Sequence, residues 1–154
     1  MVCHTLHPLH VAVVDADPLY CSVLARQLEE QSGGFLSVII RAGNGAELLV
    51  ALEGRLPDVV LMDPMVPVMD GRTTVGYLKA LFPEILVAAF LPAGEDIDHE
   101  RWSLRSGFDI RLRKSDDLFA IISRIRRAAI GTESGSGRSE QVLFRDYSRM
   151  SAPR

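Results

Sequence analysis

The sequence has little of what would tie it to disulfides, nucleic acids or membranes. Only two cysteines occur in the 154 residues, Cys3 and Cys21, and they match neither a disulfide framework nor the spacing of a zinc site. A net charge of -3 gives no broad basic surface for nucleic acid. The longest apolar stretch, residues 85–92, is far shorter than a membrane span. We therefore expect a cytoplasmic protein whose chain binds neither nucleic acid nor membrane.

Short apolar runs alternate with segments of helical period along most of the chain. A length of 154 residues with 47% hydrophobic content suffices for one well-buried domain but not for two. Five strand–helix repeats predict a parallel sheet with helices on both faces and right-handed crossovers. The predicted strands cover residues 10–15, 35–41, a run that ends at residue 63, 85–91 and 107–112, and the predicted helices cover 18–31, 46–52, 73–81, 96–105 and 116–130.

The character of the sequence changes after Ile130. The next seven residues, Gly-Thr-Glu-Ser-Gly-Ser-Gly, have the composition of a flexible linker, and residues 138–154 carry only scattered apolar side chains. Such a segment cannot bury enough apolar surface to fold by itself. We therefore predict one domain over residues 8–130, followed by a flexible linker and C-terminal tail over residues 131–154.

The predicted first helix begins with a recognisable cap. Asp17 can accept a hydrogen bond from the first turn, and Pro18 suits the first helical position. Apolar residues at helical spacing predict the buried sides of the first and last helices. They are Leu19, Val23, Leu24 and Leu28 in the first helix, and Leu118, Ile122, Ile125 and Ala129 in the last.

Asp63 stands where the apolar run Val59-Val60-Leu61-Met62 stops. Such a run is typical of a parallel strand that is buried on both faces. Open α/β sheets bind their ligands at the carboxyl ends of the strands, so an acid at this point is available for chemistry. The alternative is that Asp63 only caps a turn or a helix.

Val13-Val14-Asp15, residues 42–47, residues 57–71 and Lys114 follow one another in a characteristic order and spacing. These segments resemble the receiver domain of bacterial response regulators. The start Asp15-Ala16-Asp17-Pro18 resembles the acid-acid-histidine-proline start of regulators of the NarL and FixJ type, which look most similar. The most specific segment is 58–71, where Asp63 is followed by Pro67 and then by Asp70-Gly71. The resemblance covers residues 10–130 and implies a flavodoxin-like (βα)5 fold, a role in a two-component phosphorelay, and a signalling module rather than an enzyme.

The resemblance also implies roles for individual residues. Asp63 would accept a phosphoryl group from the histidine of a sensor kinase. Asp15, Asp63 and the backbone carbonyl of Met65 would bind Mg²⁺, which prefers oxygen ligands. Lys114 would contact the phosphoryl oxygens.

Three positions depart from the family pattern. Ala16 replaces the second acid after the first strand, which is a metal ligand, so we expect weak Mg²⁺ binding. Leu91 replaces a hydroxyl residue at the end of the fourth strand, and Arg111 replaces the aromatic residue that reports the switch. We therefore expect weak or no phosphorylation, and signalling by contact with a sensor histidine kinase or another signalling protein. A homodimer through the fourth helix, fifth strand and last helix is a further expectation, with Trp102, Arg111 and Phe119 in the contact patch.

Three alternatives remain open at this stage. The chain could be the receiver half of a regulator with a DNA-binding helix-turn-helix domain. Asp15 and Asp17 could instead be the nucleophile and the general acid of a haloacid-dehalogenase-type phosphatase. His4, His7 and His10, which recur beside Cys3, could bind a transition metal, although a mobile N-terminal segment is the simpler interpretation.

Overall fold

The computed structural model describes residues 7–93 and 107–130. Several predictions therefore lie outside the described residues. These are the helix over residues 96–105 with Trp102, the metal-binding hypothesis for Cys3 and His4, and the tail over residues 131–154. Within the described ranges no helix is both long enough and apolar enough to cross a membrane.

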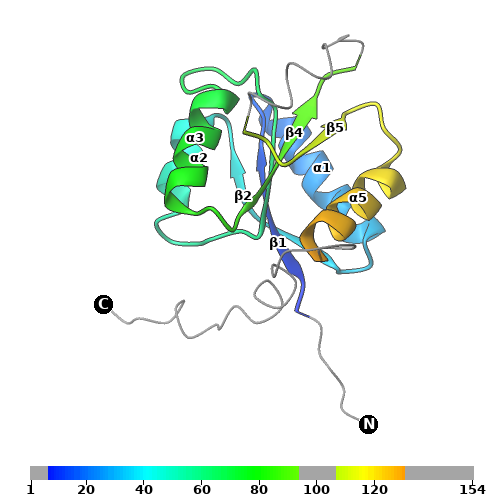
Figure 1. Cartoon of the computed structure of the whole chain (residues 1–154). Coiled ribbons are helices and arrows are strands. Elements are labelled where there is room, and N and C mark those ends of the chain that lie inside the picture. The colour runs from blue at the N-terminus through cyan, green and yellow to red at the C-terminus, as the bar shows by residue number, and fades with distance from the viewer. Residues whose placement is uncertain (1–6, 94–106, 131–154) are drawn as a thin grey trace.

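Five strands form one parallel sheet in the order β2-β1-β3-β4-β5 (Figure 1). This order is the flavodoxin-like arrangement, and it confirms the predicted fold class. The strands are β1 (Leu9–Val14), β2 (Leu36–Ala42), β3 (Val59–Met62), β4 (Leu86–Leu91) and β5 (Ile110–Arg113), and the described helices are α1 (Pro18–Gln31), α2 (Gly45–Ala51), α3 (Gly71–Leu81) and α5 (Leu118–Ile130).

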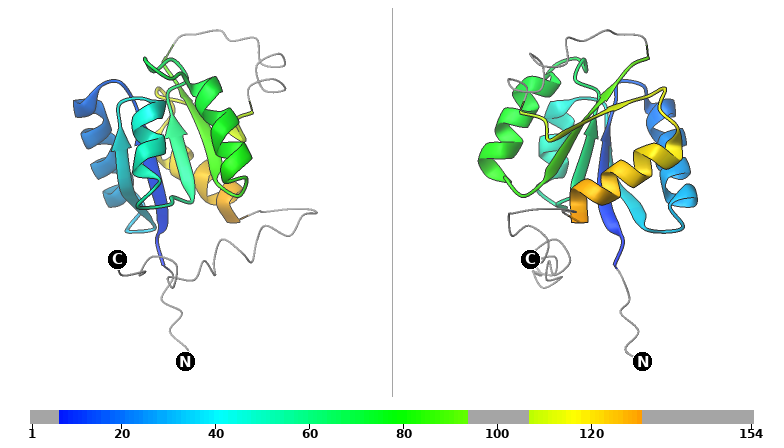
Figure 2. Two further views of the ribbon diagram at one scale, coloured as in Figure 1. Left: turned by 90° about the vertical axis from the view of Figure 1, so that its left-hand side faces the viewer. Right: turned by 45° about the vertical axis from the view of Figure 1, so that its right-hand side comes forward.

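The sheet separates two apolar cores. Helices α1 and α5 cover one face of the sheet, and α2 and α3 cover the other. Both views in Figure 2 show this arrangement. Because successive strand residues point to opposite faces, Val11 and Val13 of β1 lie in the first core, and Ala12 and Val14 lie in the second. The whole of β3 is buried, which explains why its sequence is an uninterrupted apolar run.

The predicted buried side of α1 was partly wrong. Leu24 and Leu28 are buried as predicted, but Leu19 is 72% exposed and Val23 is 46% exposed. At roughly 100° per residue, Leu19 lies on the opposite side of the helix from Leu28. The side that packs on the sheet consists of Cys21, Leu24, Ala25 and Leu28.

The last helix and the last strand differ less from the prediction. In α5, Ile122, Ile125 and Ala129 are buried as predicted, with Ile121 in place of Leu118, which is only partly buried. Strand β5 begins at Ile110 rather than at residue 107, because Gly107 has a φ of 78° and turns the chain before the strand.

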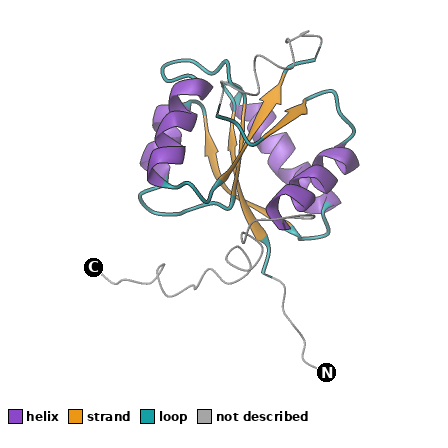
Figure 3. Cartoon of the chain, in the orientation of Figure 1, coloured by secondary structure: helices purple, strands orange, loops and turns teal. Residues whose placement is uncertain are grey.

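Parallel strands bring the residues that follow them to one edge of the sheet. In Figure 3, the loops after β3 and β5 lie at the same end of the molecule. Asp15 follows β1, Asp63 follows β3, and Lys114 follows β5. The sheet order makes β1 and β3 neighbours and puts β5 two strands from β3, which is within reach of a long lysine side chain.

Candidate functional site

Asp15, Asp63 and Lys114 meet at the carboxyl edge of the sheet. Their backbones continue the strand ladders, since Asp15 N donates to Ala42 O at 3.0 Å and Asp63 N donates to Val14 O at 3.0 Å. On the far side, Lys114 N donates to Leu91 O at 2.8 Å. The position of each of these three residues is therefore fixed by sheet hydrogen bonds rather than by a free loop.

The Lys114 ammonium lies between the two carboxylates. Its Nζ is 2.5 Å from Asp15 Oδ2 and 2.8 Å from Asp63 Oδ2. All three side chains are largely buried, with exposed fractions of 20% for Lys114, 9% for Asp15 and 15% for Asp63. Partial burial strengthens the attraction between the charges because little water screens them.

Protonation of the lysine is favoured by this arrangement. Burial alone would lower the pKa of Lys114, but hydrogen bonds to Asp15 and Asp63 outweigh that effect and raise the pKa above the ordinary lysine value. Lys114 therefore carries its charge throughout the neutral pH range. The three side chains together hold one positive and two negative charges.

The remaining carboxylate oxygens also have partners. Asp15 Oδ1 accepts a hydrogen bond from the Asp17 amide at 2.9 Å, and Asp63 Oδ1 accepts one from the Met65 amide at 2.8 Å. Both carboxylates are thus held in orientation by the loop that follows their own strand. Asp63 takes part in a turn, as the capping alternative proposed, and also faces Lys114.

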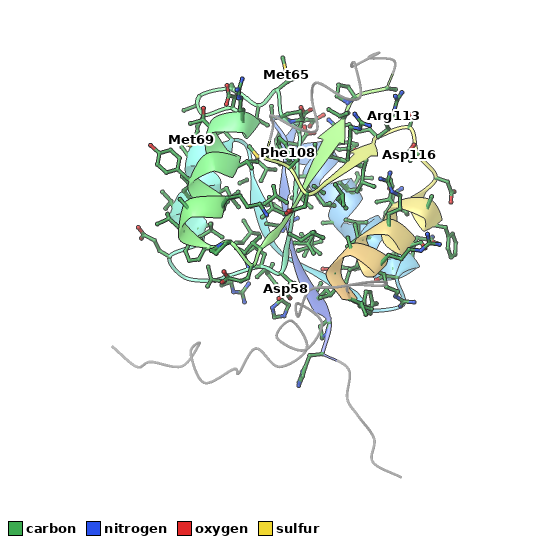
Figure 4. All side chains as sticks on the ribbon, viewed as in Figure 1. Asp58, Met65, Met69, Phe108, Arg113 and Asp116 are labelled. Carbon is green, nitrogen blue, oxygen red and sulfur yellow. The ribbon has the colours of Figure 1, made fainter. Side chains whose placement is uncertain are left out.

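The loop after Asp63 is held by Asp70 and Gly71. Asp70 caps α3, because its Oδ1 accepts a hydrogen bond from the Thr73 amide at 2.8 Å. The Gly71 amide donates to Pro64 O at 3.0 Å, and a Cβ on Gly71 would lie 2.5 Å from Pro64 Cα. The Asp-Gly pair therefore lets the start of α3 approach the residue next to Asp63. Figure 4 shows Met65 at the outer edge of this loop.

Asp17 is the N-cap of α1, as predicted. Its Oδ1 accepts hydrogen bonds from the amides of Leu19 at 2.9 Å and Tyr20 at 3.2 Å, and Pro18 opens the helix. Ala16, between Asp15 and Asp17, brings no side-chain oxygen to the edge. Asp17 already has a structural use for its carboxylate, so it is poorly placed to substitute for an acid at position 16.

The donors at this edge fit Mg²⁺ only in part. Two carboxylates and the Met65 carbonyl would supply oxygens, and the lysine ammonium already contacts both carboxylates. Within residues 7–93 and 107–130, no group of three or more His, Cys, Asp or Glu residues could hold a metal ion. An acid at position 16 would have been the third such ligand.

The other two departures from the family pattern can also be located. Leu91 ends β4 and is buried. Arg111 on β5 is partly buried, and its Nη1 has no hydrogen-bond partner in the described part of the chain. Phe119, at the start of α5, is 67% exposed.

Two residues at the site were missed in the sequence. The Tyr20 ring lies beneath the Lys114 ammonium, with Nζ 4.8 Å from the ring centroid. Phe90 stacks on the same ring, at 6.4 Å between centroids and an interplanar angle of 29°. Only its position in the sequence could have pointed to Tyr20, which lies in the first turn of the helix that follows Asp15.

A family model described as the response regulator receiver domain matches residues 11–126. The chain belongs to the response regulator receiver family. It is therefore a receiver domain of a two-component response regulator, as the motifs around Asp15, Asp63 and Lys114 indicated. This membership replaces the phosphatase hypothesis for Asp15 and Asp17.

Individual relatives agree with the family model. An uncharacterized 14.6 kDa protein of Leptolyngbya boryana is 32% identical, over 80% of this chain and 92% of the relative. The transcriptional regulatory protein PrrA of Mycobacterium tuberculosis is 31% identical, over 80% of this chain but only 53% of PrrA. The structure of the signal receiver domain of NarL from Mycobacterium tuberculosis has a TM-score of 0.67 at 27% identity, and the match covers 81% of this chain and 98% of that one.

Proposed function

We propose that this receiver has Asp63 at its phosphoacceptor position but forms a phosphoryl adduct only weakly, and that it signals mainly by contact with other proteins. The observation that carries the proposal is the pair of contacts that Lys114 makes to Asp15 and Asp63, next to an alanine at position 16. The protein's own lysine offsets one of the two carboxylate charges of the site, and the site lacks one acidic ligand for a divalent cation.

Charge explains why this arrangement opposes phosphorylation. A phosphoryl group carries negative charge on three equatorial oxygens in the transition state, and catalysis depends on positive charge placed around them. Here the negative charge of the two carboxylates already exceeds the positive charge of the single ammonium. Loss of even an outer-shell partner of a metal typically lowers affinity about 10- to 100-fold, and loss of a direct ligand should cost no less.

Mg²⁺ would be held by Asp15, Asp63 and the Met65 carbonyl, with reduced affinity. When bound, it would neutralise the phosphoryl oxygens. The protein itself orients the Asp63 carboxylate through the Met65 amide and supplies Lys114 as a point charge. These roles are carried over to this chain from the matching positions of the receiver family.

An intact-mass experiment tests the proposal. The protein is incubated with acetyl phosphate and Mg²⁺, and we expect a small mass increase in a minor fraction of molecules or none. Asp63→Asn should abolish any adduct. Asp17→Asn is the matched control, because it removes one nearby charge while asparagine keeps the helix cap. A near-stoichiometric adduct in the wild type would refute weak phosphorylation, and an equal adduct in Asp63→Asn would show that the acceptor is elsewhere.

Signalling by protein contact needs an accessible surface. The exposed side chain of Phe119 supports such a surface at the start of α5. A large apolar side chain that is 67% exposed is a candidate anchor for a partner. The proposed partners are a sensor histidine kinase, another signalling protein, or a second copy of the chain. In sedimentation analysis, Phe119→Ala should weaken association, whereas Leu81→Ala, on the exposed side of α3, should not. Equal association constants for the wild type and Phe119→Ala would remove this surface from the proposal.

A second candidate is the receiver half of a longer DNA-binding regulator. The match to PrrA favours it, since the chain spans only about half of that transcriptional regulator. The discriminating observation is the mass of the native polypeptide in its own cells. A mass near 17.0 kDa would favour a stand-alone receiver, and a substantially larger one would favour the regulator.

A further inference from the structure

Tyr20 contacts both the acceptor site, through Lys114, and the apolar core, through Phe90 of β4. Its ring faces the Lys114 ammonium, with Nζ 4.8 Å from the ring centroid, and also stacks on Phe90. The residue sits in the first turn of α1, where its amide donates to Asp17 Oδ1. The helix cap therefore holds the backbone of Tyr20, and the stacking on Phe90 holds its ring.

The ring has little freedom to leave this position. Phe90 is buried in the core between the sheet and helices α1 and α5, and Tyr20 packs against the same cluster. Burial is the main cause of the raised pKa of the Tyr20 phenol, with the nearby Asp15 and Asp63 charges adding to it and Lys114 opposing it. The phenol thus stays neutral, and its ring face presents the negative side of the aromatic quadrupole to a cation.

The ammonium is held by three groups at once. Two carboxylate oxygens accept its hydrogen bonds, at 2.5 Å for Asp15 and 2.8 Å for Asp63, and the ring contacts the same Nζ atom. A lysine held only by its flexible stem would exchange among several positions, whereas this one is restricted to the space between the acids. A Mg²⁺ ion that takes the Oδ2 atoms of both carboxylates would displace the ammonium from at least one of them.

We propose that Tyr20 is a positioning residue that holds Lys114 on the Asp15–Asp63 pair, so that the lysine is the resident cation of the site and competes with a divalent ion. This inference rests on the proposed function, because it concerns the same acceptor site. It adds a second cause of weak Mg²⁺ binding that is independent of Ala16. A cation–π contact of this kind corresponds to about a twofold to thirtyfold change in an equilibrium constant.

The experiment is an NMR titration of the full chain with MgCl₂, followed at the amides of Asp63 and Met65. Tyr20→Leu keeps an apolar side chain but removes the ring, and we expect the Mg²⁺ affinity to rise about twofold to thirtyfold. Tyr20→Phe keeps the ring and should bind Mg²⁺ as the wild type does. An unchanged or lower affinity in Tyr20→Leu would overturn the proposal, and so would a Tyr20→Phe protein that behaves like Tyr20→Leu.

A second measurement needs no variant. The ε-methylene protons of Lys114 lie next to the face of an aromatic ring, so they should resonate upfield of ordinary lysine ε protons in the wild type. Unshifted ε protons would contradict the proposal even if Tyr20→Leu failed to fold. Neither readout depends on phosphorylation, so a stoichiometric adduct at Asp63 would refute the proposed function while leaving this test intact.

Discussion

Gly71→Ala should destabilise the protein although alanine is the better helix former. Gly71 opens α3, and an added Cβ would lie 2.5 Å from Pro64 Cα and 3.1 Å from Phe108 Cζ. Real Cβ atoms do not approach a backbone carbon so closely. Either Pro64 or the first turn of α3 must move, and Pro64 directly follows Asp63.

The magnitude follows from two opposing terms. Replacing glycine by alanine inside a helix gains about 0.5–1 kcal/mol. Forcing an extra methyl group into a packed site costs about 1–3 kcal/mol, and the upper part of that range applies because a backbone atom cannot rotate away. We expect a net loss of about 1–2 kcal/mol in the free energy of unfolding.

Urea unfolding followed by circular dichroism measures this difference, and Gly76→Ala is the matched control. Gly76 lies in the same helix, and a Cβ there would meet nothing within 4 Å. Gly76→Ala should therefore stabilise the protein by up to about 1 kcal/mol. If both variants were stabilised equally, the close approach of α3 to Pro64 would be refuted. The Met65 amide should also shift in the NMR spectrum of Gly71→Ala but not in that of Gly76→Ala.

Two further predictions concern the same loop. Val68 has a φ of 66° and is 87% exposed, so Val68→Gly should relieve backbone strain without losing packing. We expect the free energy of unfolding, measured by urea unfolding, to rise by about 1 kcal/mol. A loss of stability would show that the strained backbone is not populated. Asp70→Ala should cost about 1 kcal/mol at neutral pH through loss of the α3 cap. The backbone hydrogen bond from Thr73 is the main cause of the lowered pKa of Asp70, so this cost should be present above the ordinary aspartate pKa of about 4 and shrink as the pH falls through the lower folded value. A difference between wild type and Asp70→Ala that stayed constant down to about pH 2 would contradict that linkage.

Local patterns in the sequence predicted where the main strands and helices lie. The apolar run before Asp63 was typical of a strand buried on both faces, and Asp17-Pro18 marked a helix start because each residue satisfies a backbone requirement of the first turn. Since parallel strands end at one edge, the meeting of Asp15 and Asp63 followed from the predicted fold. Lys114 depended on the family resemblance, because a single lysine after a short strand carries no signal of its own.

The remaining features depend on packing between distant segments. Helix α1 has apolar residues on two sides, and only contact with α5 and the sheet decides that Cys21 rather than Leu19 faces inward. The contact between Tyr20 and Lys114 joins the first turn of α1 to the end of β5, which no spacing rule connects. The later start of β5 depends on the turn at Gly107.

We propose that an alanine at position 16 and a resident lysine leave the acceptor site short of negative ligands for a divalent cation. Ala16→Asp tests it most directly, because it restores a third carboxylate beside Asp15 without touching Asp63 or Lys114. In an NMR titration with MgCl₂, Ala16→Asp should bind Mg²⁺ at least about tenfold more tightly than the wild type. Identical titration curves for the two proteins would contradict the claim and place the metal ligands elsewhere.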